Sequence, residues 1–276
     1  MSRVASLFAM LGSRGEKALI GYLTVGDPDR DESLARCREV LRAGADALEL
    51  GVPYSDPLAD GPVIQAAGQR ALAAGFRLEW LWSTVETLRS EFPGVPLAVM
   101  TYVNPVLQFG LDRFVQRARD NGADALILPD LPPEESTPVR SLCQAAGLDL
   151  IPFVAPTTPL ERMQAILPGH TGFVYCVSVT GVTGTRIDGG GEGKTEIEIA
   201  RLLCTARATS GLPACLGFGI ATPGDVRRLA GEADGVIVGS ALVRARTRPE
   251  LARRVADLKA ATLPVRAEGR ADGMVK

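Results

Sequence analysis

The sequence predicts a single (β/α)8 TIM barrel, an α/β fold in which parallel strands alternate with helices. Short apolar runs recur along all 276 residues, and longer stretches with the apolar spacing of helices separate them. No tight hairpin turn joins consecutive runs, so the strands are expected to be parallel. Chains of about 250 residues commonly form one barrel of this kind.

Eight strands and eight helices follow from this alternation. The strands are predicted at 19–24, 47–51, 97–101, 125–129, 150–154, 173–177, 214–217 and 235–239. The helices are predicted at 33–43, 62–73, 78–91, 111–121, 133–146, 159–167, 196–209 and 223–230. Pro133, Pro159 and Pro223 begin three of these helices, where a first turn tolerates the missing N–H. A doubly wound open sheet is the alternative, but the chain lacks G-x-G-x-x-G after the first strand.

An internal repeat supports the βα unit. Ala-Gly-Ala-Asp-Ala-Leu at 43–48 and Asn-Gly-Ala-Asp-Ala-Leu at 121–126 each end a helix on glycine and lead into a strand. Weaker copies begin at Gly147 and Glu232. Glycine closes a helix by adopting the left-handed conformation, so these turns are expected at one end of the barrel. Residues 1–263 are predicted to form one catalytic domain, and 264–276 a flexible tail.

Composition excludes several function classes. The net charge is −2 and basic residues do not cluster, which argues against a nucleic-acid partner. No apolar stretch approaches the roughly 18 residues of a membrane span, and no secretory signal is recognisable, so we expect a cytoplasmic protein without a membrane partner. The five cysteines are odd in number and lack C-x-x-C spacing, which argues against disulfides and a zinc site.

Two carboxylates stand where barrel enzymes place their chemistry, at the carboxyl ends of strands. Glu49 lies between Leu48 and Leu50, so it points into the barrel if the leucines face the helices. A buried glutamate is costly unless it is paired or used, so either a structural or a catalytic role fits it. Asp60 follows in a proline-rich loop and either caps the next helix or acts in chemistry. Asp56 and Asp130 carry the same ambiguity.

Glycine-rich turns predict a phosphate site. They follow the last three strands, at 181–184, 217–219 and 239–240. Glycines let backbone N–H groups approach an anion, and the loops after the seventh and eighth strands often bind phosphate in barrels. The segment 181–193 includes three consecutive glycines and is expected to be a lid or a solvated connection.

Residue types that are scarce narrow the chemistry further. The one histidine, His170, precedes a strand and so lies at the wrong end of the barrel for catalysis. No nucleophile elbow or P-loop is present, and no metal site is expected. Tyr175 lies on the sixth predicted strand, where a core role is commoner than a catalytic one. We therefore expect acid/base chemistry on a small phosphorylated molecule.

The acid-bearing loop resembles the signature of the tryptophan synthase α subunit family. The matching run is Ala-Leu-Glu-Leu-Gly-Val-Pro-Tyr-Ser-Asp-Pro-Leu-Ala-Asp-Gly-Pro-Val-Ile-Gln at 47–65. The likeness continues in order through 23–28, 100–105, 128–132, 179–184, 217–219 and 238–240. The resemblance implies the same barrel and the retro-aldol cleavage of indole-3-glycerol phosphate to indole and glyceraldehyde 3-phosphate, a lyase reaction in tryptophan biosynthesis that needs no metal or cofactor in this chain.

The resemblance also implies roles for individual residues. Glu49 matches the acid/base residue, and Asp60 matches the acid that binds the indole N–H. Tyr175 matches a residue that lines the same pocket and is grouped with these two acids. The phosphate-binding positions of the family match Gly184, Gly219, Gly239 and Ser240. The apolar walls of its indole pocket match Tyr22, Met100, Leu128 and Phe218. The lid residue that meets Asp60 matches Thr183. The run 185–194 departs from the family in its high glycine content.

A partner subunit is implied as well. Family members pass indole to a β subunit that uses pyridoxal phosphate, usually in an αββα heterotetramer, and Asp56, Pro57, Asn104 and Pro105 match the docking loops. A stand-alone indole-3-glycerol phosphate lyase that releases free indole is the alternative. A phosphosugar isomerase would need a second electrophile such as histidine, and a regulatory barrel would bind its ligand without cleaving it.

Overall fold

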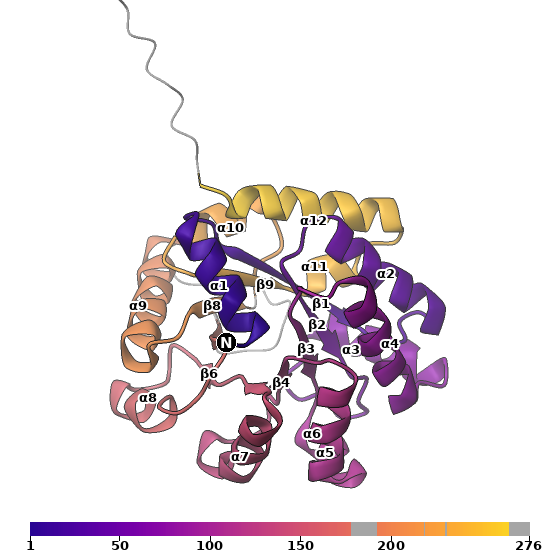
Figure 1. The fold of residues 1–276 in the computed structure, drawn as a ribbon. Coiled ribbons are helices and arrows are strands. Elements are labelled where there is room, and N and C mark those ends of the chain that lie inside the picture. Colours follow the sequence, from indigo (N-terminus) through magenta and orange to yellow (C-terminus); the bar gives the residue numbers. More distant parts are fainter. Residues whose placement is uncertain (178–191, 218, 230, 265–276) are drawn as a thin grey trace, which may run out of the picture.

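A computed structural model describes residues 1–177, 192–217, 219–229 and 231–264 (Figure 1). Its strands are β1 (Ala18–Thr24), β2 (Ala47–Gly51), β3 (Leu97–Met100), β4 (Ala125–Ile127), β5 (Asp149–Leu150), β6 (Phe153–Val154), β7 (Val174–Val177), β8 (Ala214–Gly217) and β9 (Gly235–Val238). Its helices are α1 (Arg3–Ser13), α2 (Arg30–Arg42), α3 (Pro62–Ala73), α4 (Leu78–Glu91), α5 (Val103–Phe109), α6 (Leu111–Asp120), the 3-10 turn η1 (Pro133–Glu135), α7 (Thr137–Ala146), α8 (Leu160–Ile166), α9 (Glu192–Ser210), α10 (Pro223–Leu229), α11 (Ser240–Val243) and α12 (Arg248–Thr262).

The parallel sheet closes on itself. Its strand order is β5-β4-β3-β2-β1-β9-β8-β7-β6, and only Ile151 and Pro152 separate the two outermost strands in the chain. The Ile151 N–H donates to the Leu126 carbonyl (3.0 Å), and the Tyr175 N–H donates to the Pro152 carbonyl (2.9 Å). One extended segment, 149–154, therefore joins β4 on one side and β7 on the other. The predicted barrel is confirmed, with its fifth strand divided at a proline.

Most predicted elements agree with the structure to within a few residues, and the exceptions have local causes. The predicted helix 133–146 is wrong as one element, because Pro138 in the first turn of α7 starts a new helix after η1. Helices α1, α5, α11 and α12 were not among the predicted helices. In α1 the signal was present, since its buried residues repeat at helical spacing: Val4, Leu7, Phe8 and Leu11.

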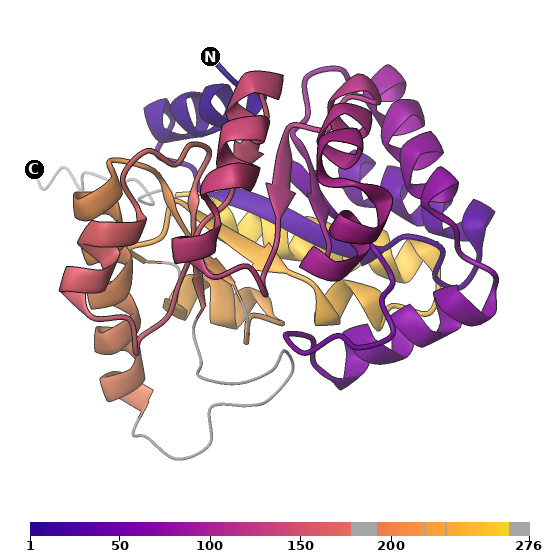
Figure 2. The same ribbon diagram turned by 90° about the horizontal axis from the view of Figure 1, so that it is seen from below.

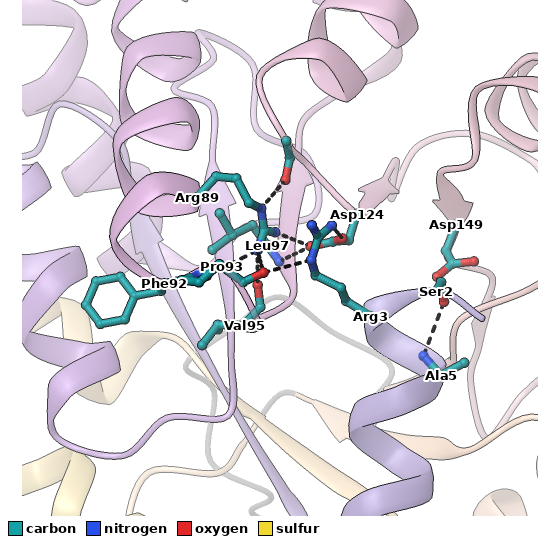
Figure 3. Close-up of polar contacts among 11 residues, drawn as sticks. Ser2, Arg3, Ala5, Arg89, Phe92, Pro93, Val95, Leu97, Asp124 and Asp149 are labelled. Atoms are coloured by element: carbon teal, nitrogen blue, oxygen red, sulfur yellow. Dashed lines mark hydrogen bonds and ion pairs between the residues drawn. The ribbon is translucent and has the colours of Figure 1, made fainter.

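Helix α1 covers the end of the barrel at which the strands begin (Figure 2). Its first turn is held by Ser2, whose hydroxyl accepts from the Ala5 N–H (3.2 Å) and donates to Asp149 (2.9 Å), as Figure 3 shows. Phe8 packs against Phe173 with ring centroids 5.9 Å apart. The helix therefore acts as a hydrophobic floor beneath the barrel interior.

The repeated Ala-Asp motif forms one recurring contact at the same end. The carboxylates of Asp46, Asp124 and Asp234 each accept a backbone N–H at the start of the neighbouring strand. The donors are Leu19 (2.7 Å), Leu97 (2.8 Å) and Ala214 (2.8 Å). Each carboxylate also pairs with a cation. Asp124 forms ion pairs with two arginines, Arg3 and Arg89, as Figure 3 shows. The predicted helix-closing glycines are confirmed, with positive φ at Gly44, Gly122 and Gly147.

The core lies between the barrel and its ring of helices, and buried residues from Val4 to Leu258 form one cluster. Leu48, Leu50, Leu97 and Leu126 are fully buried within it. Among the described residues, no helix is both long enough and apolar enough to cross a membrane.

Candidate active site

Glu49 points into the barrel. Strand β2 pairs with β1 and β3 so that Glu49 stands level with Tyr22 and Ala98. Leu48 faces the helices, since a Cβ on the adjacent Gly21 would meet Leu48 together with Val40 of α2 and Leu242 of α11. Alternation then turns Glu49 to the inner face. The predicted orientation of this side chain is confirmed.

The Glu49 carboxyl lies in an apolar environment. It is 1% exposed, and neither of its oxygens has a hydrogen-bond partner. Ala98 on the next strand is small, and an enclosed space of about 20 Å³ lies between Glu49, Phe8 and Phe173. Burial raises the pKa of Glu49 from 4.5 to about 8, because water cannot stabilise its anion. Near pH 7 the side chain is a neutral acid that can give up its proton.

Asp60 lies in the loop between β2 and α3, and it does not cap that helix. Gly61 is the N-cap residue, and no side chain caps the first turn. The Asp60 N–H donates to the Pro57 carbonyl (3.1 Å), and its own carbonyl accepts from the Gln65 amide (2.7 Å). Because these two hydrogen bonds use only the backbone of Asp60, its carboxylate remains available for other contacts.

The Asp60 carboxylate is also desolvated, but less so than Glu49. Burial raises the pKa of Asp60 from 3.8 to about 6, and a hydrogen bond from the Tyr102 hydroxyl opposes that rise. The same hydroxyl accepts from the Ala59 N–H (3.0 Å). Tyr102 therefore fixes the loop and supports the charged form of Asp60. This role was not predictable from the sequence, because Tyr102 is distant from Asp60 along the chain.

Two tyrosines complete the inner surface. A Cβ on Gly51 would lie 2.1 Å from the Tyr22 oxygen, and one on Gly217 would lie 2.3 Å from a Tyr175 ring carbon. The missing side chains leave the space that these rings occupy. The charges of Glu49 and Asp60 both raise the pKa of Tyr22 and of Tyr175, in addition to the larger effect of burial. The structure thus brings the two acids and two of the predicted pocket residues together.

The two acids favour opposite protonation states near pH 7. Glu49 is mostly neutral because its pKa is about 8, and Asp60 is mostly ionised because its pKa is about 6. A pair of carboxyl groups with separated pKa values can serve as a proton donor and as a stabiliser of positive charge in the same cavity. This arrangement suits proton transfer to a substrate that becomes cationic.

The glycine turns predicted to bind phosphate are described only in part. Gly219 has a φ of +76°, and Gly239 precedes the short helix α11, which begins at Ser240. A Cβ on Gly239 would lie 3.3 Å from the Tyr22 ring, so this turn adjoins the tyrosine of the pocket. Strands β8 and β9 are neighbours, which brings the two turns to one edge of the barrel mouth. Gly184, the lid residue Thr183 and Phe218 lie outside the described residues.

The predicted apolar walls are only partly on the inner face. Met100 stands level with Gly51 on β2 and with Ile127 on β4. Leu128 is one residue further along the chain, so alternation turns it the opposite way, and it lines a groove on the helix side of the barrel. Ile127 therefore takes the inner position that we had predicted for Leu128. A prediction of strand register, rather than of residue type, would have found it.

The loops predicted to dock a partner are joined to each other. Tyr54 stacks on Tyr102 with ring centroids 5.1 Å apart, and the Asn104 amide donates to the Tyr54 hydroxyl (3.1 Å). Asp56 and Asn104 are exposed, and Pro57 and Pro105 are partly so. Leu58 (82% exposed) and Leu107 (60%) present apolar surface beside them, which the sequence reading did not single out.

Within the described part of the chain, no group of three or more His, Cys, Asp or Glu side chains is placed to hold a metal ion. His170 lies just before β7, at the end of the barrel away from Asp60, as expected from the sequence.

The closed barrel and its two buried acids define a (β/α)8 barrel with a candidate acid/base site. Residues 8–267 match the family model described as "Tryptophan synthase alpha chain". Proteins of that name from Carboxydothermus hydrogenoformans and Roseiflexus sp. (strain RS-1) are 50% and 49% identical over 243 residues, which is 88% of this chain and 88% and 91% of theirs. The chain belongs to the tryptophan synthase alpha chain family.

Solved structures agree with this assignment. A Mycobacterium tuberculosis tryptophan synthase structure has a TM-score of 0.87 and 37% identity, covering 95% of this chain and 99% of that one. A protein from Aquifex aeolicus VF5 has the same TM-score and identity, covering 96% of this chain and 100% of its own. Both matches extend over almost the whole barrel.

Proposed function

We infer that the chain is a lyase that cleaves indole-3-glycerol phosphate to indole and glyceraldehyde 3-phosphate, the α reaction of tryptophan synthase. The observation that carries the residue assignment is the pair of buried acids, Glu49 and Asp60, with their pKa values on either side of neutrality. Cleavage of the bond between the indole ring and the glycerol phosphate side chain requires two proton movements. One proton is added to the C3 carbon of the ring, and one is removed from the adjacent side-chain hydroxyl.

We propose that Glu49 performs both movements. Its neutral form donates a proton to C3, and the resulting carboxylate removes the hydroxyl proton as the carbon–carbon bond breaks and the aldehyde forms. The residue ends the cycle protonated, as it began. A positioned acid or base typically contributes about 10² to 10⁴ in rate. Its unpartnered oxygens suit this role, because no contact within the protein has to break first.

Asp60 would accept a hydrogen bond from the indole N–H and stabilise the positive charge of the protonated ring. Its ionised form, which Tyr102 supports, is the form that this role requires. Tyr22, Tyr175 and Met100 would form the walls around the ring. Ile127 joins them in our proposal because it shares the inner face with Met100.

Backbone N–H groups would hold the phosphate. Gly219, Gly239 and Ser240 stand at the ends of neighbouring strands, where glycines permit close approach to an anion. Gly184 would complete this site, Thr183 would meet Asp60 from the lid, and Phe218 would add to the indole pocket. These three assignments depend on the family resemblance alone.

The partner would be a β subunit that holds pyridoxal phosphate and converts the indole to L-tryptophan, in an αββα heterotetramer. Asp56, Pro57, Asn104 and Pro105 would dock there, together with the exposed Leu58 and Leu107. Tyr102 stacks on Tyr54 of one docking loop and also contacts Asp60. A partner seated on these loops would therefore act on Asp60 through Tyr102.

We also propose that residues 1–263 form one catalytic domain, since a single buried cluster runs through them. A cytoplasmic location is proposed as well. All five cysteines are unpaired, which suits a reducing compartment.

The decisive experiment is to incubate the purified chain with indole-3-glycerol phosphate, with and without a β subunit, and to quantify indole. We expect Glu49→Gln to reduce cleavage by at least about 10² while the fold persists. Glu86→Gln, on the exposed face of α4, is the matched control and should leave the rate unchanged. Unchanged cleavage in the Glu49 variant would remove Glu49 from the mechanism. Fast indole release that a β subunit does not accelerate would favour the stand-alone lyase.

A further inference from the structure

The short helix α11 is held at its carboxyl end by a side chain from α2. The Arg36 guanidinium donates to the carbonyl oxygens of Ala245 (2.9 Å), Leu242 (3.1 Å) and Val243 (3.4 Å). The last carbonyl groups of a helix have no partner within the helix, so they need donors from elsewhere. Helix α2 lies beside α11 in the barrel (Figure 1), although 206 residues separate Arg36 from Leu242 in the sequence.

Arg36 is buried, and its contacts are unusual for a cation. The residue is 6% exposed, and the three hydrogen bonds that it forms within the described residues all end on carbonyl oxygens, with no carboxylate among them. A buried cation without a carboxylate is costly, so these three bonds are what stabilise it. The Val243 and Ala245 carbonyls accept from no other group in the described part of the chain. Removal of Arg36 would therefore leave two buried acceptors unsatisfied.

Apolar packing fixes the same pair of helices. Val40 follows Arg36 by one helical turn and so lies on the same face of α2. A Cβ on Gly21 of β1 would lie 2.8 Å from Val40 and 3.3 Å from Leu242, so these two side chains meet over the glycine. Helix α2 therefore holds α11 against β1 by a polar and an apolar contact, one turn apart.

The residues that Arg36 binds are also bonded to the turn before α11. The Gly239 carbonyl accepts from the Leu242 N–H (2.9 Å) and from the Val243 N–H (3.0 Å). Leu242 and Val243 thus donate to Gly239 through their N–H groups and accept from Arg36 through their carbonyls. In a helical turn the carbonyls point toward the carboxyl end and the N–H groups toward the amino end. A side chain that fixes the carbonyls therefore also sets the direction of the N–H groups at the start of the turn.

We propose that Arg36 is a positioning residue for the substrate phosphate. Acting through Leu242 and Val243, it fixes Gly239 and Ser240 so that their N–H groups point at the phosphoryl oxygens, and it does not itself touch the substrate. This role rests on the proposed function, in which Gly239 and Ser240 bind the phosphate. The two acids stand on β2 and the loop after it, so Arg36 governs the binding of the phosphate rather than proton transfer.

The test compares two ligands that differ only in the phosphate, indole-3-propanol and indole-3-propanol phosphate. Neither carries a hydroxyl on the carbon beside the ring, so neither can be cleaved. Isothermal titration calorimetry gives the Kd of each ligand for the unaltered chain and for Arg36→Met, which keeps an unbranched apolar side chain and removes every donor. We expect the substitution to raise the Kd of the phosphate at least about tenfold and to change that of the alcohol by less than about twofold.

Cleavage kinetics give a second readout that a loss of folded protein would not imitate. The phosphate is unchanged by the reaction, so weaker binding of it should raise the KM for indole-3-glycerol phosphate and leave kcat unchanged. A smaller folded fraction would instead lower kcat and leave KM unchanged. Arg36→Lys keeps a cationic donor at this position and should recover part of the affinity that Arg36→Met loses.

Arg38→Met is the matched control. Arg38 lies on the same helix and pairs with Glu91 at the surface, so this substitution makes the same change in net charge without touching α11. It should leave both Kd values unchanged. If Arg36→Met does not fold, Arg36→Lys supplies the same two-ligand comparison, because an ammonium group cannot span the three carbonyls as a guanidinium does.

The outcomes also distinguish the role of Arg36 from the proposed function. Equal weakening of both ligands in Arg36→Met, no weakening of either, or a fall in kcat without a rise in KM would overturn the role of Arg36. If the unaltered chain binds the two ligands equally well, the phosphate site is refuted, and the role of Arg36 with it. If both ligands behave as expected but the unaltered chain releases no indole from indole-3-glycerol phosphate, the cleavage reaction is refuted and the role of Arg36 stands.

Discussion

Replacing Glu49 by glutamine should make the protein less active but more stable at alkaline pH. Burial raises the pKa of Glu49 from 4.5 to about 8, so the folded chain keeps a proton that the unfolded chain releases above pH 4.5. The folded state then binds more protons than the unfolded state, and the free energy of unfolding falls as pH rises from about 4.5 to about 8. Glutamine does not titrate, so Glu49→Gln removes this dependence.

The expected size follows from the same two values. Each pH unit within that interval costs about 1.4 kcal/mol. Between pH 5 and pH 8, the stability of the variant relative to the unaltered chain should therefore rise by roughly 3 to 4 kcal/mol. Any constant cost of placing an amide in the pocket cancels from this difference. Urea unfolding followed by circular dichroism at pH 5, 6, 7 and 8 measures it.

Two comparisons make the measurement decisive. Glu86→Gln changes an exposed residue and should follow the unaltered chain at every pH. Asp60 titrates in both proteins, so its contribution cancels from the difference. A stability difference for Glu49→Gln that stays flat across this pH range would refute the reasoning, because Glu49 would then have an ordinary pKa in the folded protein.

Three further substitutions test other parts of the structure. Tyr102→Phe removes the hydrogen bond that lowers the pKa of Asp60, so the acidic limb of the kcat/KM profile, expected near pH 6, should move to higher pH. Gly217→Ala places a Cβ 2.3 Å from the Tyr175 ring, and this overpacking should lower kcat/KM at least about tenfold and cost about 1 to 3 kcal/mol of stability. Asp124→Asn breaks a buried ion pair at the other end of the barrel and should cost about 3 kcal/mol in urea unfolding while kcat is unchanged.

Each of these has a matched control. Tyr54→Phe keeps the ring that stacks on Tyr102 and should not move the acidic limb. Gly68→Ala lies in α3 with open space around the added carbon, so it should be neutral or slightly stabilising. Asp120→Asn is exposed at the end of α6 and should change stability by less than about 0.5 kcal/mol. Equal effects in a variant and its control would contradict the contact on which that prediction depends.

The barrel was predictable because its elements carry local signals. Alternation within 47–51 placed Glu49 on the inner face, and the Ala-Asp repeats located helix ends whose glycines have positive φ. The division of the fifth strand was not predictable, since it depends on pairing with two different strands on either side of Pro152. Helix α12 was missed although its signals are local, since Thr247 caps its first turn and Leu251, Val255 and Leu258 are buried at helical spacing.

The candidate site was likewise predictable only where the signal is local in the sequence. Glu49 and Asp60 were identified as candidates from position and residue type, and only the fold revealed how differently burial affects them. Tyr102 acts on Asp60 from a different loop, which a single sequence does not disclose. The error at Leu128 was one residue of register, and a shift of one residue reverses the face of a strand.

Helix α1 has a consequence for engineering at the amino terminus. Val4, Leu7 and Phe8 seal the space under Glu49 and keep water from reaching the carboxyl group from below. A truncation or fusion that lifts this helix would hydrate the acid and return it to ordinary acidity, with every residue of the substrate cavity still in place. Such an enzyme would fail as a proton donor for a reason that inspection of its substrate-binding side would never reveal.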